Sequence, residues 1–86
     1  MSIREDSKKI IQHFLEKAIE CGSLDAFFEF QYAELAQVLN FKDEKYCRVC
    51  CQYLSGMKYI SIGRGKYDEH PSIRLSALAI DFLETN

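Results

Sequence analysis

The chain has 86 residues, of which 48% are hydrophobic and 28% are charged, and its formal net charge is −2. This length fits a single domain spanning residues 1–86, because two separate cores would each be too small to offset the entropy lost on folding. The composition excludes a disordered chain, and no run approaches the roughly 20 apolar residues that span a bilayer. The N-terminal sequence lacks the apolar segment of a signal peptide, so we expect a cytoplasmic protein with reduced cysteines.

The charges are distributed unevenly along the chain. Residues 1–41 carry a net charge of −3, residues 42–74 a net charge of +3 and residues 75–86 a net charge of −2. An acidic protein is not expected to coat nucleic acid indiscriminately. A positive middle third, in contrast, suits local contact with an anionic partner.

The first half of the chain shows two helical patterns separated by a turn. Apolar residues recur at spacings of three and four over about residues 6–21, which predicts an amphipathic helix. Asp6 or Ser7 is expected to cap its start, and Gly22 to end it in the left-handed conformation. The sequence FFEF that follows predicts a brief extended segment. Helical spacing returns after it, with Asn40 as the expected terminator.

A third helix is predicted to start at the cap residue Asp43 and to end at Ser55-Gly56. Lys45, Arg48 and Gln52 project from the side opposite its apolar stripe. The residues of that stripe are Tyr46, Cys47, Cys50, Cys51 and Leu54.

Beyond the third helix the hydrophobic period changes from 3.6 to 2. The runs KYISIG and SIRLS alternate, which predicts a two-stranded antiparallel hairpin with Pro71 at the boundary of its second strand. Ser76 is then expected to cap a last helix over residues 77–84. Its inward-facing residues are expected to be Leu78, Ile80, Phe82 and Leu83.

This order of elements, and the residues that form them, resemble the winged helix-turn-helix family. The run YAELAQVLNFKDEKYCRVCCQYLSGMKYISI is similar to the family's second helix, turn, recognition helix and first wing strand. The run SIRLSALAIDFLE is similar to its bacterial ending, although Ala79 stands where the family often has glycine. The resemblance implies an α+β, mostly α fold: a three-helix core, a small antiparallel β-hairpin wing and a short C-terminal helix.

The resemblance also implies a function: a small, non-enzymatic, DNA-binding transcriptional regulator of a prokaryote, phage or mobile element. A recognition helix at about residues 43–55 would enter the major groove of double-stranded DNA, and a wing loop at about residues 63–71 would lie along the backbone. A homodimer is expected, because one helix reads about half of a typical operator. The DNA-binding positions carried over are Lys42, Lys45, Arg48, Gln52, Lys58, Arg64, Lys66 and Arg74.

A second interpretation stays open, in which the same fold is a protein-interaction module, such as a phage-type inhibitor or a complex subunit, that does not bind DNA. Asp43 and Glu44 at the start of the third helix favour it, because they would meet DNA phosphates. Phe27 and Phe28 are adjacent and cannot easily both face inward. Together with an apolar face of the first or last helix, they are candidates for a dimer or partner surface. Alternatively, one of them covers the edge of the short strand.

The run C-x-x-C-C formed by Cys47, Cys50 and Cys51 invites a metal interpretation. At helical spacing these thiols share the core face, so we predict that the cysteines are buried as small hydrophobic residues. A zinc site would need Cys21, His13 or His70 as further ligands, and the chain has no second C-x-x-C pair. No catalytic or phosphate-binding motif is present, so we expect no enzyme activity and no cofactor.

Overall fold

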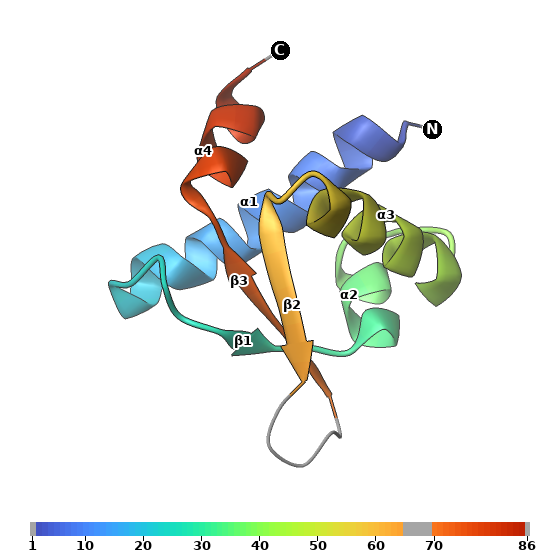
Figure 1. Ribbon diagram of the computed structural model, residues 1–86. Helices are drawn as coiled ribbons and strands as arrows, with labels where there is room; N and C mark the ends of the chain where they lie inside the picture. Colours follow the sequence, from blue (N-terminus) through green and yellow to red (C-terminus); the bar gives the residue numbers. More distant parts are fainter. Residues whose placement is uncertain (1, 65–69, 86) are drawn as a thin grey trace.

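A computed structural model describes residues 2–64 and 70–85 of the chain. Within these residues the protein is a small α+β structure, mostly helical, with a three-stranded antiparallel sheet (Figure 1). The elements in chain order are α1 (Ile3–Cys21), β1 (Phe28–Glu29), α2 (Tyr32–Val38), α3 (Glu44–Gly56), β2 (Ile60–Arg64), β3 (Pro71–Leu75) and α4 (Ala77–Glu84). None of the helices described is long and apolar enough to cross a membrane.

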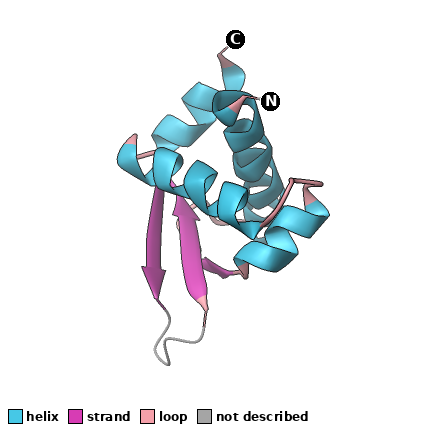
Figure 2. Ribbon diagram, turned by 90° about the vertical axis from the view of Figure 1, so that its right-hand side faces the viewer, coloured by secondary structure: helices cyan, strands magenta, loops and turns pink. Residues whose placement is uncertain are grey.

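The sheet has the strand order β1-β3-β2, so β3 is its central strand. The predicted hairpin is confirmed: β2 and β3 pair antiparallel, with Ile62 opposite Ile73, and Pro71 is the first residue of β3. The short extended segment β1 adds to the other edge of β3, where Phe28 pairs with Ile73. Figure 2 shows the helices gathered above and beside the sheet, and α1 packs against α3, α4 and β3.

Three helices end in the same backbone arrangement, a Schellman motif closed by a residue in the left-handed conformation. Gly22 ends α1 with φ 78°, and Asn40 follows α2 with φ 60°. The sequence predicted both of these positions. The end predicted for α3 at Ser55-Gly56 is confirmed, because Gly56 is the last residue of the helix. The left-handed position, however, is taken by Lys58, with φ 66°. The amide of Tyr59 donates to the carbonyl of Leu54 at 3.0 Å and closes the motif.

Of the three predicted N-terminal caps, that of α1 is wrong, that of α3 is confirmed, and that of α4 is confirmed in position but without a side-chain capping bond. The first helix begins earlier than expected, and Ser2 caps it by accepting from the amide of Glu5 at 3.3 Å, so Asp6 and Ser7 lie inside α1. Ser76 precedes α4, but its hydroxyl donates to the carbonyls of Lys58 and Tyr59 and ties the end of β3 to the start of β2. The third prediction, for α3, is confirmed.

The core is built mainly from α1, α3 and β3. Its largest fully buried side chains include Phe14, Ile10, Ile11, Leu54 and Ile73.

The last helix covers one end of this core, with Ala79 and Phe82 buried and the ring of Tyr59 stacked on Phe82 at 4.5 Å. Leu78 does not face inward as predicted: it is 54% exposed, because the small Ala79 occupies the position that meets the core. Ile80 and Leu83 are half-buried.

Candidate nucleic-acid interface

The two faces of α3 differ sharply in burial. Asp43 starts the helix as predicted, by accepting from the amide of Tyr46 at 2.8 Å. The buried face consists of Cys47, Cys50, Cys51 and Leu54, each 0% exposed. The exposed residues Lys45, Arg48, Val49 and Gln52 lie at spacings of three and four, and we call them the α3 stripe. Because the buried face fixes the helix, the stripe is presented on a rigid element.

Arg48 leans toward α2. Its guanidinium carbon lies 4.8 Å from the centroid of the Tyr32 ring, which is a cation–π contact. Such a contact holds the side chain over the ring face and leaves the in-plane N–H donors for other acceptors. The sequence predicted an exposed Arg48, and Tyr32 as its support comes only from the packing of α2 against α3.

A hydrogen bond between two half-buried side chains fixes the start of α3 against α1. The hydroxyl of Tyr46 donates to Asp6 Oδ2 at 2.5 Å, and Lys9 Nζ lies 3.4 Å from Asp6 Oδ1. The bond to the carboxylate, together with partial burial, raises the pKa of Tyr46 well above its ordinary value. The sequence did not reveal this contact, because 40 residues separate its two partners. The contact holds the first turn of the helix that carries the stripe.

The other basic positions predicted on or near α3 lie at its two ends. Lys42 precedes the cap residue, Lys58 follows the last turn, and both are exposed. The acidic residues that weigh against DNA lie at the first end: Asp43 uses its carboxylate for capping, and Glu44 is exposed. The N-terminal end of α3 is therefore of mixed charge, whereas the middle of the stripe carries no acidic side chain.

Arg74 is not part of the α3 stripe. It is half-buried on β3, and its guanidinium carbon lies 5.2 Å from the centroid of the Phe27 ring. Its neighbour Ile73 is fully buried, and successive side chains of a strand point to opposite faces of a sheet. The face of the sheet that bears Arg74 is thus the one turned away from the core.

Phe27 and Phe28 have different surroundings. Phe28 is half-buried and stacks on Phe14, with ring centroids 6.3 Å apart, so it covers the core beside the short strand. Phe27 is 54% exposed, and the guanidinium group of Arg74 lies over its ring. Of the two predicted surface residues, only Phe27 is available to a partner.

The wing positions are described only in part. The backbone of Arg64 closes β2 opposite Pro71. Lys66 and the rest of the loop at residues 65–69 lie outside the described residues. Contacts of Arg64 and Lys66 with a nucleic acid stay predictions.

Three of the four cysteines are core residues, as predicted, and Cys21 is not. Cys21 is exposed at the end of α1, where its thiol lies 3.6 Å from the carbonyl of Ser23. Burial raises the pKa of Cys50, and the hydrogen bond with Cys47 raises that of Cys51, so both thiols stay protonated. Among the residues that the structure describes, no three His, Cys, Asp or Glu side chains are placed to hold a metal ion.

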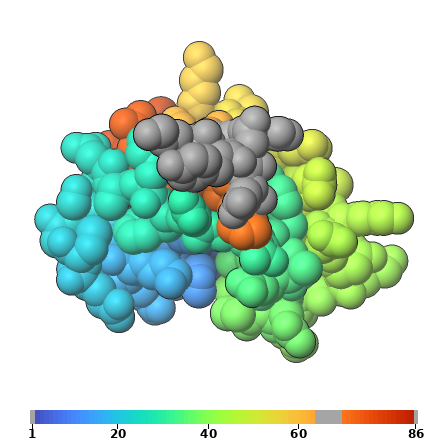
Figure 3. All heavy atoms as spheres, turned by 90° about the horizontal axis from the view of Figure 1, so that it is seen from below, coloured from blue at the N-terminus to red at the C-terminus, as the bar shows by residue number. Residues whose placement is uncertain are grey.

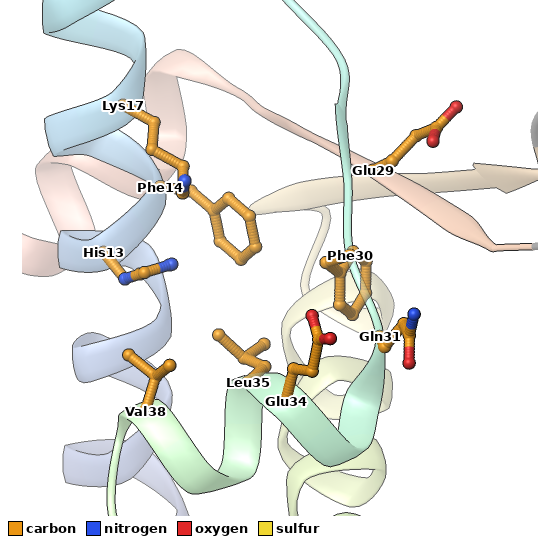
Figure 4. A pocket seen from close by; sticks show the side chains of 9 residues that line it. All are labelled: His13, Phe14, Lys17, Glu29, Phe30, Gln31, Glu34, Leu35 and Val38. Carbon is orange, nitrogen blue, oxygen red and sulfur yellow. The ribbon is translucent and has the colours of Figure 1, made fainter.

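A small pocket of about 200 Å³ lies between α1, β1 and α2 (Figure 4). Its apolar wall includes Phe14 and Phe30, whose rings meet edge to face at 5.6 Å. Lys17 and Glu34 also line it, so the polar groups have opposite charges. Partial burial, and then the charge of Lys17, lower the pKa of His13. No pattern in the sequence indicated this pocket, because the packing of three separate segments creates it.

Four of the eight predicted DNA-binding residues lie together along α3 and its start: Lys42, Lys45, Arg48 and Gln52. Lys58 lies at the far end of the same helix, and Arg74 lies on the sheet. Val49 is the member of the stripe that the sequence analysis did not single out. Its place on the stripe could have been predicted, because it is four residues after Lys45 and three before Gln52.

Comparisons with protein-family models, with curated proteins and with solved structures found no match for this chain.

Proposed function

We propose that the protein is a winged helix-turn-helix regulator that binds double-stranded DNA through α3 and performs no catalysis. The observation that carries the proposal is the α3 stripe: two basic side chains, an amide and a valine point outward from a helix whose other face is 0% exposed. The order of helices and strands and the addition of β1 to β3 support the winged-helix interpretation.

An α-helix fits the major groove, so the stripe would meet the edges of the base pairs. Arg48 has the donor geometry for O6 and N7 of guanine, and Gln52 has the donor and acceptor that adenine requires. Lys42 and Lys45 lie toward the start of the helix and suit phosphate contacts, which fix the register but carry no sequence information. Asp43 is occupied as the helix cap, which limits its cost beside a phosphate.

The proposed regulator acts as a homodimer. Exposed Ile19 borders an apolar groove of about 290 Å³ that Leu15, Leu24 and Ile80 also line. Figure 3 shows the C-terminal part of α1 (blue to cyan) and α3 (yellow-green) on opposite sides of the molecule. Pairing of two copies at the groove would leave both α3 stripes free. Each stripe could then read one half-site of a two-fold operator. This groove lies on the first and last helices, where an apolar face was expected to contribute to a dimer surface, whereas Phe28 packs on the core.

The test is a selection of binding duplexes from a random double-stranded pool, followed by affinity measurements over a range of salt. Arg48→Ala should weaken binding to the selected duplex by about 1–3 kcal/mol, and Lys45→Ala should reduce the slope of log K against log salt by about 1. Lys17→Ala is the matched control. It removes one positive charge from the pocket between α1, β1 and α2 and should change neither the affinity nor the salt slope. The same titration should give two chains per site.

Two results would contradict the proposal. One is that no duplex is enriched by the selection. The other is that Arg48→Ala, Lys45→Ala and Lys17→Ala bind the selected duplex alike. The first result would favour the protein-interaction module, and the second would mean that a surface other than α3 binds the duplex.

A further inference from the structure

Val49 occupies the middle of the α3 stripe and is 45% exposed. A lone exposed valine is ordinary on a protein surface. This one lies on a helix, where a β-branched side chain is slightly unfavourable, and its neighbours on the stripe are Lys45, Arg48 and Gln52. Helix propensity does not favour a valine at this position, and the folded chain covers its side chain only in part.

The geometry places Val49 where a major-groove helix meets the bases. Lys45 precedes it by one turn and Gln52 follows it by three residues, so the three share one side of the helix. The guanidinium carbon of Arg48 lies 4.8 Å from the centroid of the Tyr32 ring, toward α2, and Val49 stays 45% exposed. The two methyl groups of Val49 therefore form an apolar spot between polar side chains.

We infer that Val49 is a specificity-determining residue that packs against the 5-methyl group of a thymine. The inference rests on the proposed function and deepens it. In the major groove the four bases present donors and acceptors, and the methyl group of thymine is the apolar feature among them. An aliphatic side chain placed against another base would desolvate a polar edge without giving it a partner. The stripe thus reads an A·T-containing site, with Gln52 on the adenine side and Val49 on the thymine side.

The test replaces each thymine of the selected duplex, one at a time, with deoxyuridine. This change removes one methyl group and leaves base pairing intact. Transfer of a single methyl group out of water corresponds to about a threefold to fourfold change in affinity, so we expect the wild-type protein to lose about that factor at one position in each half-site.

Val49→Ala closes the double-mutant cycle. The variant should bind the thymine duplex less tightly than the wild type and should bind the thymine and deoxyuridine duplexes equally at that position. Val38→Ala is the matched control, because Val38 is an exposed valine on α2 at the pocket of Figure 4. It should keep both the affinity and the sensitivity to the methyl group.

The outcomes separate this inference from the proposed function. If a duplex is selected and Arg48→Ala weakens it, but no thymine is sensitive to loss of its methyl group, then the role of Val49 is refuted and DNA binding stands. The same holds if Val49→Ala keeps the full sensitivity, because another residue then contacts the methyl group. If no duplex is selected, the proposed function itself fails.

Discussion

The thirteen residues of α3 form two faces that differ in burial: one packs into the core and the other is exposed. The side chains of Cys47, Cys50 and Cys51 are 0% exposed, and close packing in a protein core makes a larger group there unfavourable. On the α3 stripe, the guanidinium group of Arg48 lies over the ring of Tyr32, and all four residues are exposed. The comparison teaches that substitutions on the buried face should change stability, whereas those on the stripe should change mainly the proposed binding.

The largest test of this comparison replaces one residue from each face. Leu54→Ala removes a fully buried side chain and should lower the free energy of unfolding by about 2–5 kcal/mol. Gln52→Ala, two positions away on the stripe, should change it by no more than about 0.5 kcal/mol. Urea denaturation followed by circular dichroism measures both. Equal effects would show that the two faces are not energetically distinct.

A smaller effect is expected at Tyr46, which lies on the border between the faces. Tyr46→Phe removes the hydrogen bond to Asp6 and should cost about 1–2 kcal/mol near neutral pH. Tyr53→Phe on the same helix is the matched control, because no hydrogen bond of the Tyr53 hydroxyl is found among the described residues. Its effect should stay within about 0.5 kcal/mol.

The pH dependence gives a second measurement on the same pair. The fold raises the pKa of Tyr46 above its ordinary value of 10.0, so the folded state binds the phenolic proton more tightly than the unfolded state does. The stabilisation is therefore complete below pH 10 and is lost as the pH rises above it. The wild type should lose stability above pH 10 more steeply than Tyr46→Phe. Parallel curves would mean that the hydrogen bond to Asp6 does not form.

The smallest effects are expected at the glycines near the helix ends. Gly56 is the last residue of α3 and has no positive φ, and an added Cβ would meet no atom within 4 Å, so Gly56→Ala should stabilise the protein by about 0.5–1 kcal/mol. Gly22 has equal space but φ 78°, so Gly22→Ala should destabilise it by about 1 kcal/mol. Thermal denaturation of the two variants checks the signs. A destabilising Gly56→Ala would show that Gly56, rather than Lys58, takes the left-handed conformation at the end of α3.

Local sequence signals were reliable where the determining interactions are short in range. The helix end at Gly22, the cap at Asp43 and the burial of Cys47 all depend on residues within one or two turns. The failures have the same origin. Ser76 looks like a cap in sequence, yet its hydroxyl donates to carbonyls 17 and 18 residues away. Lysine does not favour the left-handed conformation, so the sequence did not predict it at Lys58. The turn into β2 imposes it there.

The candidate site divides in the same way. The spacing of Lys45, Arg48 and Gln52 was sufficient to place them on one outward side, because helical periodicity follows from the backbone alone. The support of Arg48 by Tyr32 and the separation of Arg74 from the stripe were not readable. Both depend on how distant segments pack, which a periodic pattern does not encode.

The sequence by itself determined the helices, the hairpin and the two faces of α3, since hydrophobic period and capping act through neighbouring residues. The tertiary structure alone decided that β1 joins β3, that Tyr46 bonds Asp6, that Phe28 packs on the core and that an apolar groove forms beside Ile19. These contacts join residues far apart in the chain, and only the collapse of the whole chain around one core brings them together.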